Sequence, residues 1–513
     1  MVSRAASSSL REVRAPQGDD ADPEWTSVAL EKVLLYLIDN SGPFKELLTK
    51  VVNAATQPLR LILYCDGITP GNAMGFDNKR KSIIWYASFL EFGILLCHEE
   101  VWITIASART VWAKKVPAGV SGLTRRILRE MFIDQDIAGR GIRILGQLLR
   151  VCFHALLADE EALNAMLYIK GASGLVPCAV LCCAVNKPLT SDLEGGRRSM
   201  TQRSALLQDI GCSDVRLIGL KSDADVWAQA DEVAASKDTP GFKLKETTRG
   251  MSYHEDALLF DIPLRQHFKP ASSTSVDAMH VVFSNGVLPG EIMLLLEAMK
   301  KRHGFYFQSL RDYLGPWKWS QIGEPADCFN ERREKSSNAV LKIDASHLLA
   351  VYPAVRVFVV EALGKSTRLV NEIDSFLSVC AICDLLVEAL HCPAEARALV
   401  IADLLTTAVA TYLEAFKKAY GLEAVRFKHH QLLHLPGQIR RDKRLLACWT
   451  LERKHITAKQ AFSNFCQASV MPAGALARMV NAQVRERMHA CMYMHAWCAS
   501  LRGVDRLTCA HCT

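Results

Sequence analysis

Two aspartates follow apolar runs, and carboxylates in such positions can hold metal ions. The run from Leu59 to Cys65 stops at Asp66, and the run from Leu148 to Ala158 stops at Asp159. Short apolar runs that turn residues terminate are typical of buried strands. Phosphodiester hydrolysis with two metal ions requires several carboxylates close together, because Mg²⁺ prefers hard oxygen ligands. The two aspartates are therefore candidate ligands, although Asp66 also fits a turn and Asp159 a helix N-cap.

A third acid can come from a predicted helix near the end of the sequence. In a helix beginning near Arg444, Glu452 and His455 share one face. That face can point into a metal site, or it can be an ordinary solvated surface. Glu160 and Glu161, beside the second aspartate, are alternative third ligands.

The predicted elements between the aspartates indicate how the two carboxylates can meet. Two more strands are expected, at Ile83 to Phe92 and Val101 to Ala106, and Ser121 can cap a following helix. The strand that ends at Asp159 comes next, followed by another helix. This order resembles that of a ribonuclease-H-like sheet, in which the first and fourth strands lie side by side. Asp66 and Asp159 are then expected to meet in space.

Cysteines offer a second kind of metal site. Cys178, Cys182 and Cys183 lie close together in sequence, and thiolates at short spacing can hold Zn²⁺. Buried apolar thiols are the alternative interpretation. The chain has 17 cysteines, an odd number scattered through apolar stretches, which indicates reduced thiols rather than a disulfide framework. The closing Cys509 to Cys512 has no second pair and is interpreted as a fragment of a motif or as accidental.

Histidines add fewer constraints. His280 can be a further metal ligand, a member of the acidic pocket, or a partly buried histidine with a hydrogen-bond partner. His430 and His434 are four residues apart, but no glutamate stands at the metalloprotease position between them. The sequence therefore argues against a zinc protease.

Four blocks of sequence resemble those of eukaryotic cut-and-paste DNA transposases of the CACTA, Plavaka and Kyakuja-Dileera-Zisupton groups. The blocks are Leu61 to Asn72, Leu157 to Leu163, Asp277 to His280, and His429 to Lys459. The resemblance implies an α/β protein with a ribonuclease-H-like mixed sheet and a large, mostly helical insertion before the last acidic helix.

The same resemblance implies the chemistry. Asp66, Asp159 and Glu452 would be the catalytic acids that hold Mg²⁺ or Mn²⁺, with Asp277, His280 and His455 nearby. Relatives suggest a Cys-x-x-Cys after the second acid, whereas this chain has three residues between its first two clustered cysteines. That spacing puts a structural Zn²⁺ held by Cys178 and Cys182 in doubt.

Length and composition favour several domains. We expect a disordered N-terminus and leading helix at 1–55, the first part of the catalytic domain at 56–169, a mostly helical insertion with the cysteine cluster at 170–425, the closing part of the catalytic domain at 426–475 and a helical tail at 476–513. A helix from Pro393 to Gly421 is the longest periodic piece.

Charge and hydropathy limit the partners. The net charge of +7 permits DNA as a partner without requiring it, and scattered basic groups such as Lys79 to Lys81, Arg332-Arg333 and Arg440-Arg441 can each contact a phosphate. No run of about 18 uninterrupted apolar residues occurs, so no membrane span is expected. The resulting hypothesis is a nuclear, DNA-binding transposase that acts as a homo-oligomer.

The alternative hypothesis is a catalytically decayed or domesticated transposase that binds DNA or other partners. The altered cysteine spacing, the lack of a zinc-finger module at the N-terminus and the abrupt C-terminus favour it.

Overall fold

The structure is a computed structural model, and it describes residues 10–13, 25–69, 81–186, 210–305, 307–317, 319, 328–329, 341–364, 366–463 and 479. The chain divides into two compact units. Unit 1 comprises the described residues of 1–156, 254–268 and 450–513, and unit 2 those of 157–253 and 269–449. The expected tail at 476–513, the terminal Cys-x-x-Cys, Lys79, Arg80 and the pair Arg332-Arg333 lie outside the described residues, apart from Met479.

Unit 1 is built on a mixed sheet, so the fold is α/β as expected. Within unit 1 the strand order is β1-β2-β5-β4-β3-β8, and the short strand β9 belongs to unit 2. The strands are β1 (Leu10–Val13), β2 (Trp25–Val28), β3 (Leu59–Ile68), β4 (Ser82–Phe89), β5 (Ile103–Arg109), β8 (Val151–Ala158) and β9 (Thr274–Val276), with a separate hairpin of β6 (Ile142–Ile144) and β7 (Gln147–Leu149). The predicted neighbourhood of the strand that carries Asp66 and the strand that ends before Asp159, β3 and β8, is confirmed.

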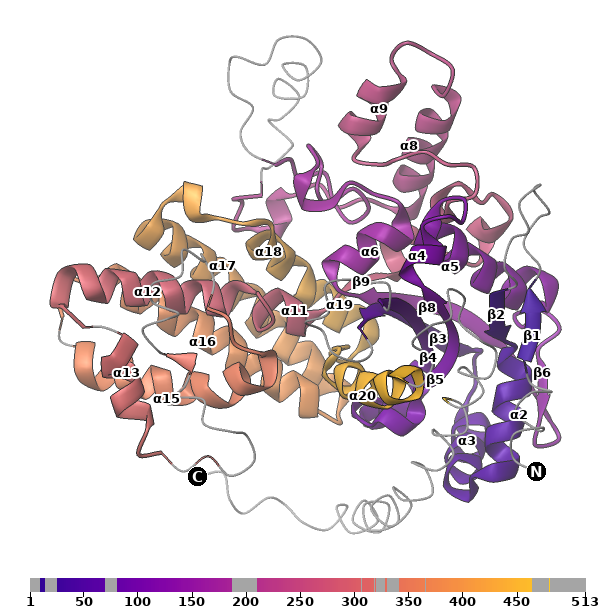
Figure 1. Ribbon diagram of the computed structural model, residues 1–513, viewed down its shortest axis with the longest axis horizontal. Coiled ribbons are helices and arrows are strands. Elements are labelled where there is room, and N and C mark those ends of the chain that lie inside the picture. The colour runs from indigo at the N-terminus through magenta and orange to yellow at the C-terminus, as the bar shows by residue number, and fades with distance from the viewer. Residues whose placement is uncertain are drawn as a thin grey trace. The chain divides into compact units, whose positions relative to one another are not determined.

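Helices surround this sheet. They are α2 (Leu30–Asn40), α3 (Gly42–Ala54), α4 (Thr110–Ala113), α5 (Gly119–Arg129) and α20 (Trp449–Ser463), with short 3₁₀ helices η1 (Leu90–Cys97), η2 (Glu99–Val101), η7 (Leu258–Phe260) and η8 (Pro263–Gln266) and the π-helix η3 (Glu130–Asp134). Figure 1 shows α20, in yellow, running across the strands β3 to β5.

The strand pairing explains which helix covers which face. Tyr64 of β3 lies opposite Tyr86 of β4, and Cys65 lies opposite Trp85. Successive side chains of a strand point to opposite faces, so the two tyrosines share one face and Trp85 is on the other. The Trp85 indole donates to Thr124 Oγ1 of α5 over 3.1 Å. His455 of α20 stacks on Tyr86 with ring centroids 5.7 Å apart. Therefore α5 and α20 cover opposite faces, and all of β4 is buried.

Some boundaries differ from the sequence prediction. Strand β3 continues to Ile68, so Asp66 lies within the strand rather than in a turn. Ser121 does not cap α5, because the helix starts at Gly119 and the Ser121 hydroxyl instead accepts a hydrogen bond from the Leu258 amide over 2.8 Å. The last acidic helix starts at Trp449, later than the expected Arg444.

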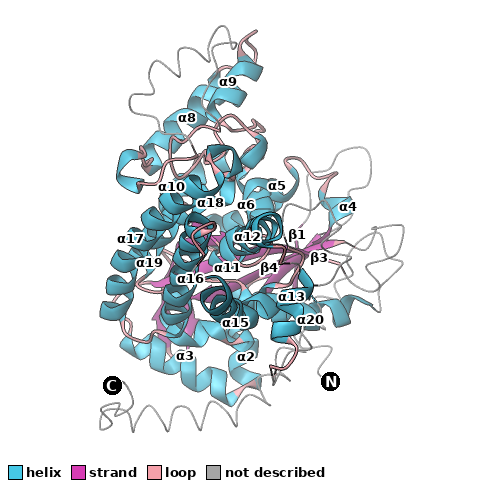
Figure 2. Ribbon diagram, turned by 90° about the vertical axis from the view of Figure 1, so that its left-hand side faces the viewer, coloured by secondary structure: helices cyan, strands magenta, loops and turns pink. Residues whose placement is uncertain are grey.

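Unit 2 is mostly helical. Its elements are α6 (Glu160–Leu167), η4 (Gly171–Ser173), η6 (Val215–Leu217), α8 (Asp223–Ala235), α9 (Phe242–Arg249), α10 (Pro270–Ser273), α11 (Ala278–Val282), α12 (Val287–His303), α13 (Phe307–Leu314), α15 (Ala345–Leu363), α16 (Val370–His391), α17 (Glu395–Tyr420), η10 (Leu422–Ala424), α18 (Phe427–Gln431), η11 (Leu432–His434) and α19 (Leu435–Asp442). Helix α16 packs against α12, α15 and α17, and Figure 2 shows α15, α16 and α17 grouped together. The predicted helix from Pro393 to Gly421 is confirmed as α17.

Three segments are long and apolar enough to cross a membrane, by length and composition alone. They are Ala278–His303, Ala345–Leu363 and Glu395–Tyr420, and 72%, 44% and 39% of their most apolar windows are buried inside the structure. Charged residues such as Arg356 in the second segment and Asp403 in the third interrupt their apolar runs. The expectation of no membrane partner stays a prediction.

Candidate metal centres

The first centre lies on the face of the sheet that α20 covers. Asp66 is one of the last residues of β3, two positions after Tyr64 and therefore on the same face. The Tyr64 hydroxyl donates to Asp66 Oδ2 over 2.9 Å, and the Gly67 amide donates to Oδ1 over 2.5 Å. These bonds fix the carboxylate at the edge of the buried strand.

Helix α20 brings a second carboxylate and an imidazole to Asp66. Ligand atoms of Asp66, Glu452 and His455 all lie within 4.8 Å of one another. His455 Nδ1 is 3.8 Å from Asp66 Oδ2 and 3.6 Å from Glu452 Oε2. The His455 side chain is 2% exposed, whereas that of Glu452 is 40% exposed. The cluster therefore has a buried wall and one side that solvent reaches.

Contacts along α20 hold this arrangement in place. Lys454 is almost completely buried, donates to the Glu99 carbonyl over 3.1 Å, and places its ammonium 5.6 Å from the centre of the Tyr86 ring. Arg453 forms an ion pair with Glu99 over 3.2 Å. Since Glu452 and His455 flank these two anchors, the residues that fix the helix also orient the candidate ligands.

The second acid of the sequence hypothesis belongs to unit 2. Asp159 is the N-cap of α6, and its Oδ1 accepts from the Ala162 amide over 2.7 Å. The next residue, Glu160, is largely buried, and burial raises its pKa. Lys428 faces both acids, and burial lowers its pKa while their charges oppose that change. The convergence of Asp159 with Asp66 and Glu452 stays a prediction.

A second centre, within unit 2, consists of two cysteines and two histidines. Ligand atoms of Cys178, Cys182, His430 and His434 lie within 4.8 Å of one another, and all four residues are buried. Cys178 Sγ is 3.3 Å from His434 Nε2, Cys182 Sγ is 3.3 Å from His430 Nε2, and the two Nε2 atoms are 3.2 Å apart. Four soft or borderline ligands thus point at one small volume.

The two thiols differ in their ionisation. A hydrogen bond from the Cys182 thiol lowers the pKa of Cys178, whereas burial raises the pKa of Cys182. A bound cation would favour the thiolate form of both cysteines.

Local backbone geometry explains the pairing of these ligands. The Cys182 amide donates to the Cys178 carbonyl over 3.3 Å, so three intervening residues form a single α-turn that brings both sulfurs to one side. His430 and His434 have the same spacing on α18 and η11. Cys183, the third of the clustered cysteines in the sequence, is outside this group of ligand atoms.

A third group, Asp277, His280 and Cys448, also has its ligand atoms within 4.8 Å. However, Asp277 is the N-cap of α11. Its Oδ1 accepts from the Met279 amide over 3.3 Å and the Cys448 amide over 2.9 Å, and its Oδ2 accepts from the His280 amide over 3.0 Å and lies 2.5 Å from His280 Nδ1. The oxygens of this carboxylate already accept several hydrogen bonds as a helix cap. These bonds favour a structural role for the group over a metal site.

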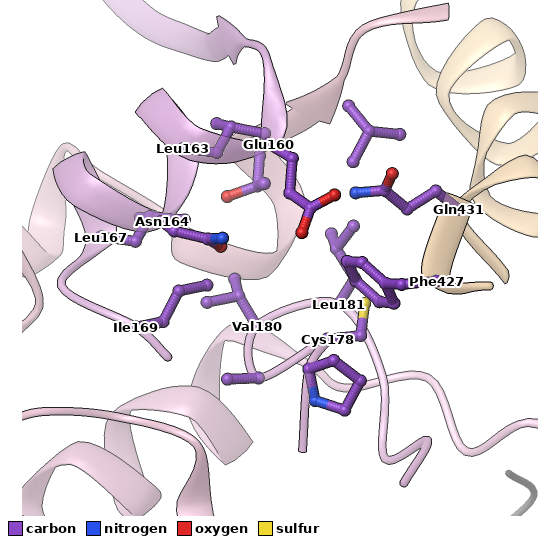
Figure 3. A pocket seen from close by; sticks show the side chains of 14 residues that line it. Glu160, Leu163, Asn164, Leu167, Ile169, Cys178, Val180, Leu181, Phe427 and Gln431 are labelled. Carbon is purple, nitrogen blue, oxygen red and sulfur yellow. The ribbon is translucent and has the colours of Figure 1, made fainter. Parts of the chain in front are cut away.

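A cavity lies beside the cysteine-histidine centre. Its wall includes Cys178, and polar groups reach it from Glu160, Asn164 and Gln431. In Figure 3 the Glu160 carboxyl and the Gln431 amide point toward one another across apolar walls. Gln431 is 4% exposed, and its Oε1 has no hydrogen-bond partner within the described part of the chain. Glu160 therefore lines this cavity in unit 2.

The sequence matches no protein-family model and no curated protein. The functional argument consequently depends on the geometry of the centres.

Proposed function

We propose that the protein is a DDE/D-type, transposase-like protein that cuts and joins DNA with metal-assisted phosphodiester chemistry. The observation that carries this proposal is the meeting of Asp66 and Glu452, which lie far apart in the sequence, in one cluster with His455. Two like-charged carboxylates at short range destabilise each other unless a cation or proton is shared. Their convergence on a half-exposed edge favours a functional site.

The order of the strands supports the same proposal. Three antiparallel strands, β3, β4 and β5, are followed by α5 and by β8, which lies next to β3. This is the order expected of a ribonuclease-H-like sheet. In such a sheet, Asp159 follows the strand beside the one that carries Asp66.

The roles of the residues follow from their surroundings. Asp66, Glu452 and Asp159 would hold Mg²⁺ or Mn²⁺, which supplies Lewis-acid activation of water and stabilises the leaving oxygen. Tyr64 holds the Asp66 carboxylate through its hydroxyl. His455 is buried against Tyr86, and its Nδ1 lies 3.6 Å from Glu452 Oε2.

The cysteine-histidine centre fits Zn²⁺ as a structural ion. A tetrahedral site with ordinary Zn–S and Zn–N bonds has S···N separations of about 3.6 Å and N···N separations of about 3.3 Å. The separations of 3.3 Å and 3.2 Å between the ligand atoms agree with that geometry. The ion would tie the turn at Cys178 to α18 within unit 2. The spacing of three residues between the cysteines is thus compatible with zinc.

A nicking experiment tests the proposed function. Full-length, zinc-loaded protein is incubated with supercoiled plasmid and Mg²⁺ or Mn²⁺. We expect Asp66→Asn and Glu452→Gln to reduce nicking by about 100-fold or more, the order expected when a preorganised charged group is removed from an active site. The matched control is Asp39→Asn on the exposed end of α2, which should nick like the wild type.

Two outcomes decide between the hypotheses. Nicking that is unchanged in Asp66→Asn and Glu452→Gln contradicts the catalytic assignment. If the wild type binds DNA but does not nick it with either metal, the catalytically decayed, DNA-binding alternative is favoured instead.

A further inference from the structure

The cavity beside the cysteine-histidine centre has the form of a binding site, and the metal chemistry proposed above does not use it. About 370 Å³ of its space is not filled by atoms, and part of that space is open to solvent. Much of its wall is apolar, with side chains such as Leu163 and Leu181, while Glu160, Asn164 and Gln431 add polar groups. All of these residues belong to unit 2. An apolar cavity with a few convergent polar groups is the usual form of a small-molecule site.

Gln431 contributes a buried polar group without a partner. The residue is 4% exposed, and its Oε1 has no hydrogen-bond partner in the part of the chain that the structure describes. Figure 3 shows its amide directed toward the carboxyl group of Glu160. A half-turn of the amide exchanges its oxygen and nitrogen, so either atom can face the cavity. A buried acceptor without a partner is destabilising, and a ligand with N–H donors would satisfy it.

Two further polar groups face the same space. Glu160 is the only residue with a charged side chain among the described residues that line the cavity. Asn164 directs its amide toward the middle of the cavity in Figure 3. Gly171 leaves room for this amide, because a Cβ at Gly171 would lie 1.9 Å from Asn164 Nδ2. Carboxyl oxygens accept hydrogen bonds, whereas amides both accept and donate. The lining therefore suits a ligand that presents N–H donors with an acceptor beside them.

The surroundings favour a neutral ligand over a cation. Burial raises the pKa of Glu160, although the charge of Lys428 lowers it. Burial also lowers the pKa of Lys428, although the charges of Glu160, Asp159 and Asp277 oppose that change. The environment thus disfavours charges of both signs. A neutral amino group fits it better than an ammonium group.

An aromatic ring adds a flat surface to the wall. Phe427 lines the cavity, and Figure 3 shows its ring among the side chains that surround it. The ring stacks on His430 with centroids 5.7 Å apart and an angle of 18° between the planes, which holds it in place. Planar heterocycles stack well on such rings.

We infer that this cavity binds a nucleobase that carries an amino group, such as cytosine or adenine. The two hydrogens of the amino group are donated to Glu160 and Gln431, the adjacent ring nitrogen accepts from the Asn164 amide, and the ring packs on Phe427. The base belongs to a free nucleoside or to an unstacked position of a nucleic acid, since both present the same edge. The inference does not depend on DNA cleavage, because it concerns binding and uses none of the proposed catalytic acids.

The test is a calorimetric titration of the zinc-loaded full chain with cytidine and with adenosine. Glu160→Met and Gln431→Met keep the length of each side chain and remove its polar atoms. The matched control is Glu161→Met, because Glu161 is the next residue of α6 and is exposed. A control ligand, N4,N4-dimethylcytidine, has the ring of cytidine without the N–H donors. Zinc content and circular dichroism show whether each variant is folded.

We expect Glu160→Met and Gln431→Met each to weaken cytidine binding by about ten-fold, the order expected for the loss of a buried hydrogen bond. Glu161→Met should bind like the wild type, and dimethylcytidine should bind at least about ten-fold more weakly than cytidine. Without ligand, Gln431→Met should keep the urea midpoint of the wild type, because it removes an oxygen that has no partner.

Competition experiments identify the source of the base. A cytosine-containing single strand that displaces cytidine, when the same strand with abasic positions does not, identifies an unstacked base of a nucleic acid. Displacement by nucleosides alone identifies a free nucleoside. Absence of saturable nucleoside binding, equal affinity in the wild type and both cavity variants, or equal affinity for dimethylcytidine overturns the inference.

Discussion

Four side chains decide whether unit 2 holds a metal, and one neighbouring cysteine provides a control. Cys178 belongs to the buried cluster, whereas the half-buried Cys183 lies outside it. We expect Cys178→Ser to lose one equivalent of zinc per chain relative to the wild type, and Cys183→Ser to retain it. Metal-binding energy is also folding energy, so Cys178→Ser should lose on the order of several kcal/mol of stability.

Elemental analysis of the purified proteins measures the zinc, and urea unfolding followed by circular dichroism measures the stability. Equal zinc in the two serine variants would show that the cluster is a set of buried thiols and imidazoles without a metal.

A single buried acid should make unit 2 sensitive to pH. Glu291 on α12 is completely buried, and burial raises its pKa from 4.5 to about 8. The Tyr412 hydroxyl donates to its Oε2 over 3.3 Å, while Oε1 has no partner in the part of the chain that is described. The nearby carboxylate of Glu372 raises the pKa further.

The sign of the effect follows from proton binding. Between pH 4.5 and 8 the folded protein keeps the Glu291 proton that the unfolded chain has released, so this group's stabilisation is complete below pH 4.5 and is lost as pH rises through 8. The expected slope is about −1.4 kcal/mol per pH unit in that window. Glu291→Gln should remove the slope and be more stable than the wild type at pH 8.5. The control Glu297→Gln, at an exposed position of the same helix, should keep the slope of the wild type. Urea unfolding from pH 5 to 8.5 measures the slopes. If the midpoints of all three proteins change with pH in the same way, the buried-acid interpretation is wrong.

At the scale of elements, helix α11 begins at a buried cap that has an exposed counterpart. Asp277 caps α11 and contacts His280, and Asp344 caps α15 and contacts His347 in the same way, three residues later. The Asp277 side chain is 0% exposed and that of Asp344 is 62% exposed. The same motif therefore occurs in two environments.

Only the buried cap also binds the amide of Cys448, which precedes α20. We expect Asp277→Asn to destabilise the protein by about 2–3 kcal/mol, because an amide NH₂ would face several N–H donors in a buried place. Asp344→Asn should cost less than about 1 kcal/mol, as expected for an exposed cap. Urea unfolding measures both. A loss of bound metal in Asp277→Asn without a loss of stability would instead indicate a ligand.

The elements that the sequence predicts well are those whose pattern is local. The apolar runs of β3 and β8 and the periodic helix α17 were predictable, because burial on both faces of a strand or along one helix face leaves a repeating signal. The start of α5 was not, since the Ser121 hydroxyl bonds a distant amide rather than its own helix.

The cysteine-histidine centre shows what local patterns miss. The short spacing of Cys178 and Cys182 indicates a metal site, whereas His430 and His434 without an intervening glutamate do not fit a protease motif. The cysteine pair and the histidine pair are each spaced four residues apart, and this spacing places two ligands on one side of a helical turn. The shared spacing is the feature of the sequence that indicates a four-ligand site. Sequence alone does not bring two such pairs together, because their meeting depends on how the intervening helices pack.

At the scale of the whole molecule, the proposed acids are divided between the units. Asp66 and Glu452 belong to unit 1, and Asp159 belongs to unit 2. The first segment of unit 1 ends at Leu156, within strand β8, and Asp159 follows the strand directly. Asp159 is also the N-cap of α6, so a catalytic role for this residue has to be separated from its role as a helix cap.

Mutant cycles distinguish these two roles of Asp159. If Asp66 and Asp159 hold the same ions, Asp66→Asn, Asp159→Asn and the double variant should all fall to the same background nicking rate, because residues that act as a unit are strongly non-additive. Glu161→Gln, an exposed change in the same helix, should nick like the wild type. If Asp159 is only the N-cap of α6, Asp159→Asn should lose at most about 1 kcal/mol of stability, since asparagine also caps helices well, and should retain nicking. Nicking rates with Mg²⁺ and with Mn²⁺ detect a lost metal ligand, and urea unfolding midpoints of the same variants detect a weakened helix. Nicking that Asp159→Asn retains would exclude Asp159 from the catalytic residues.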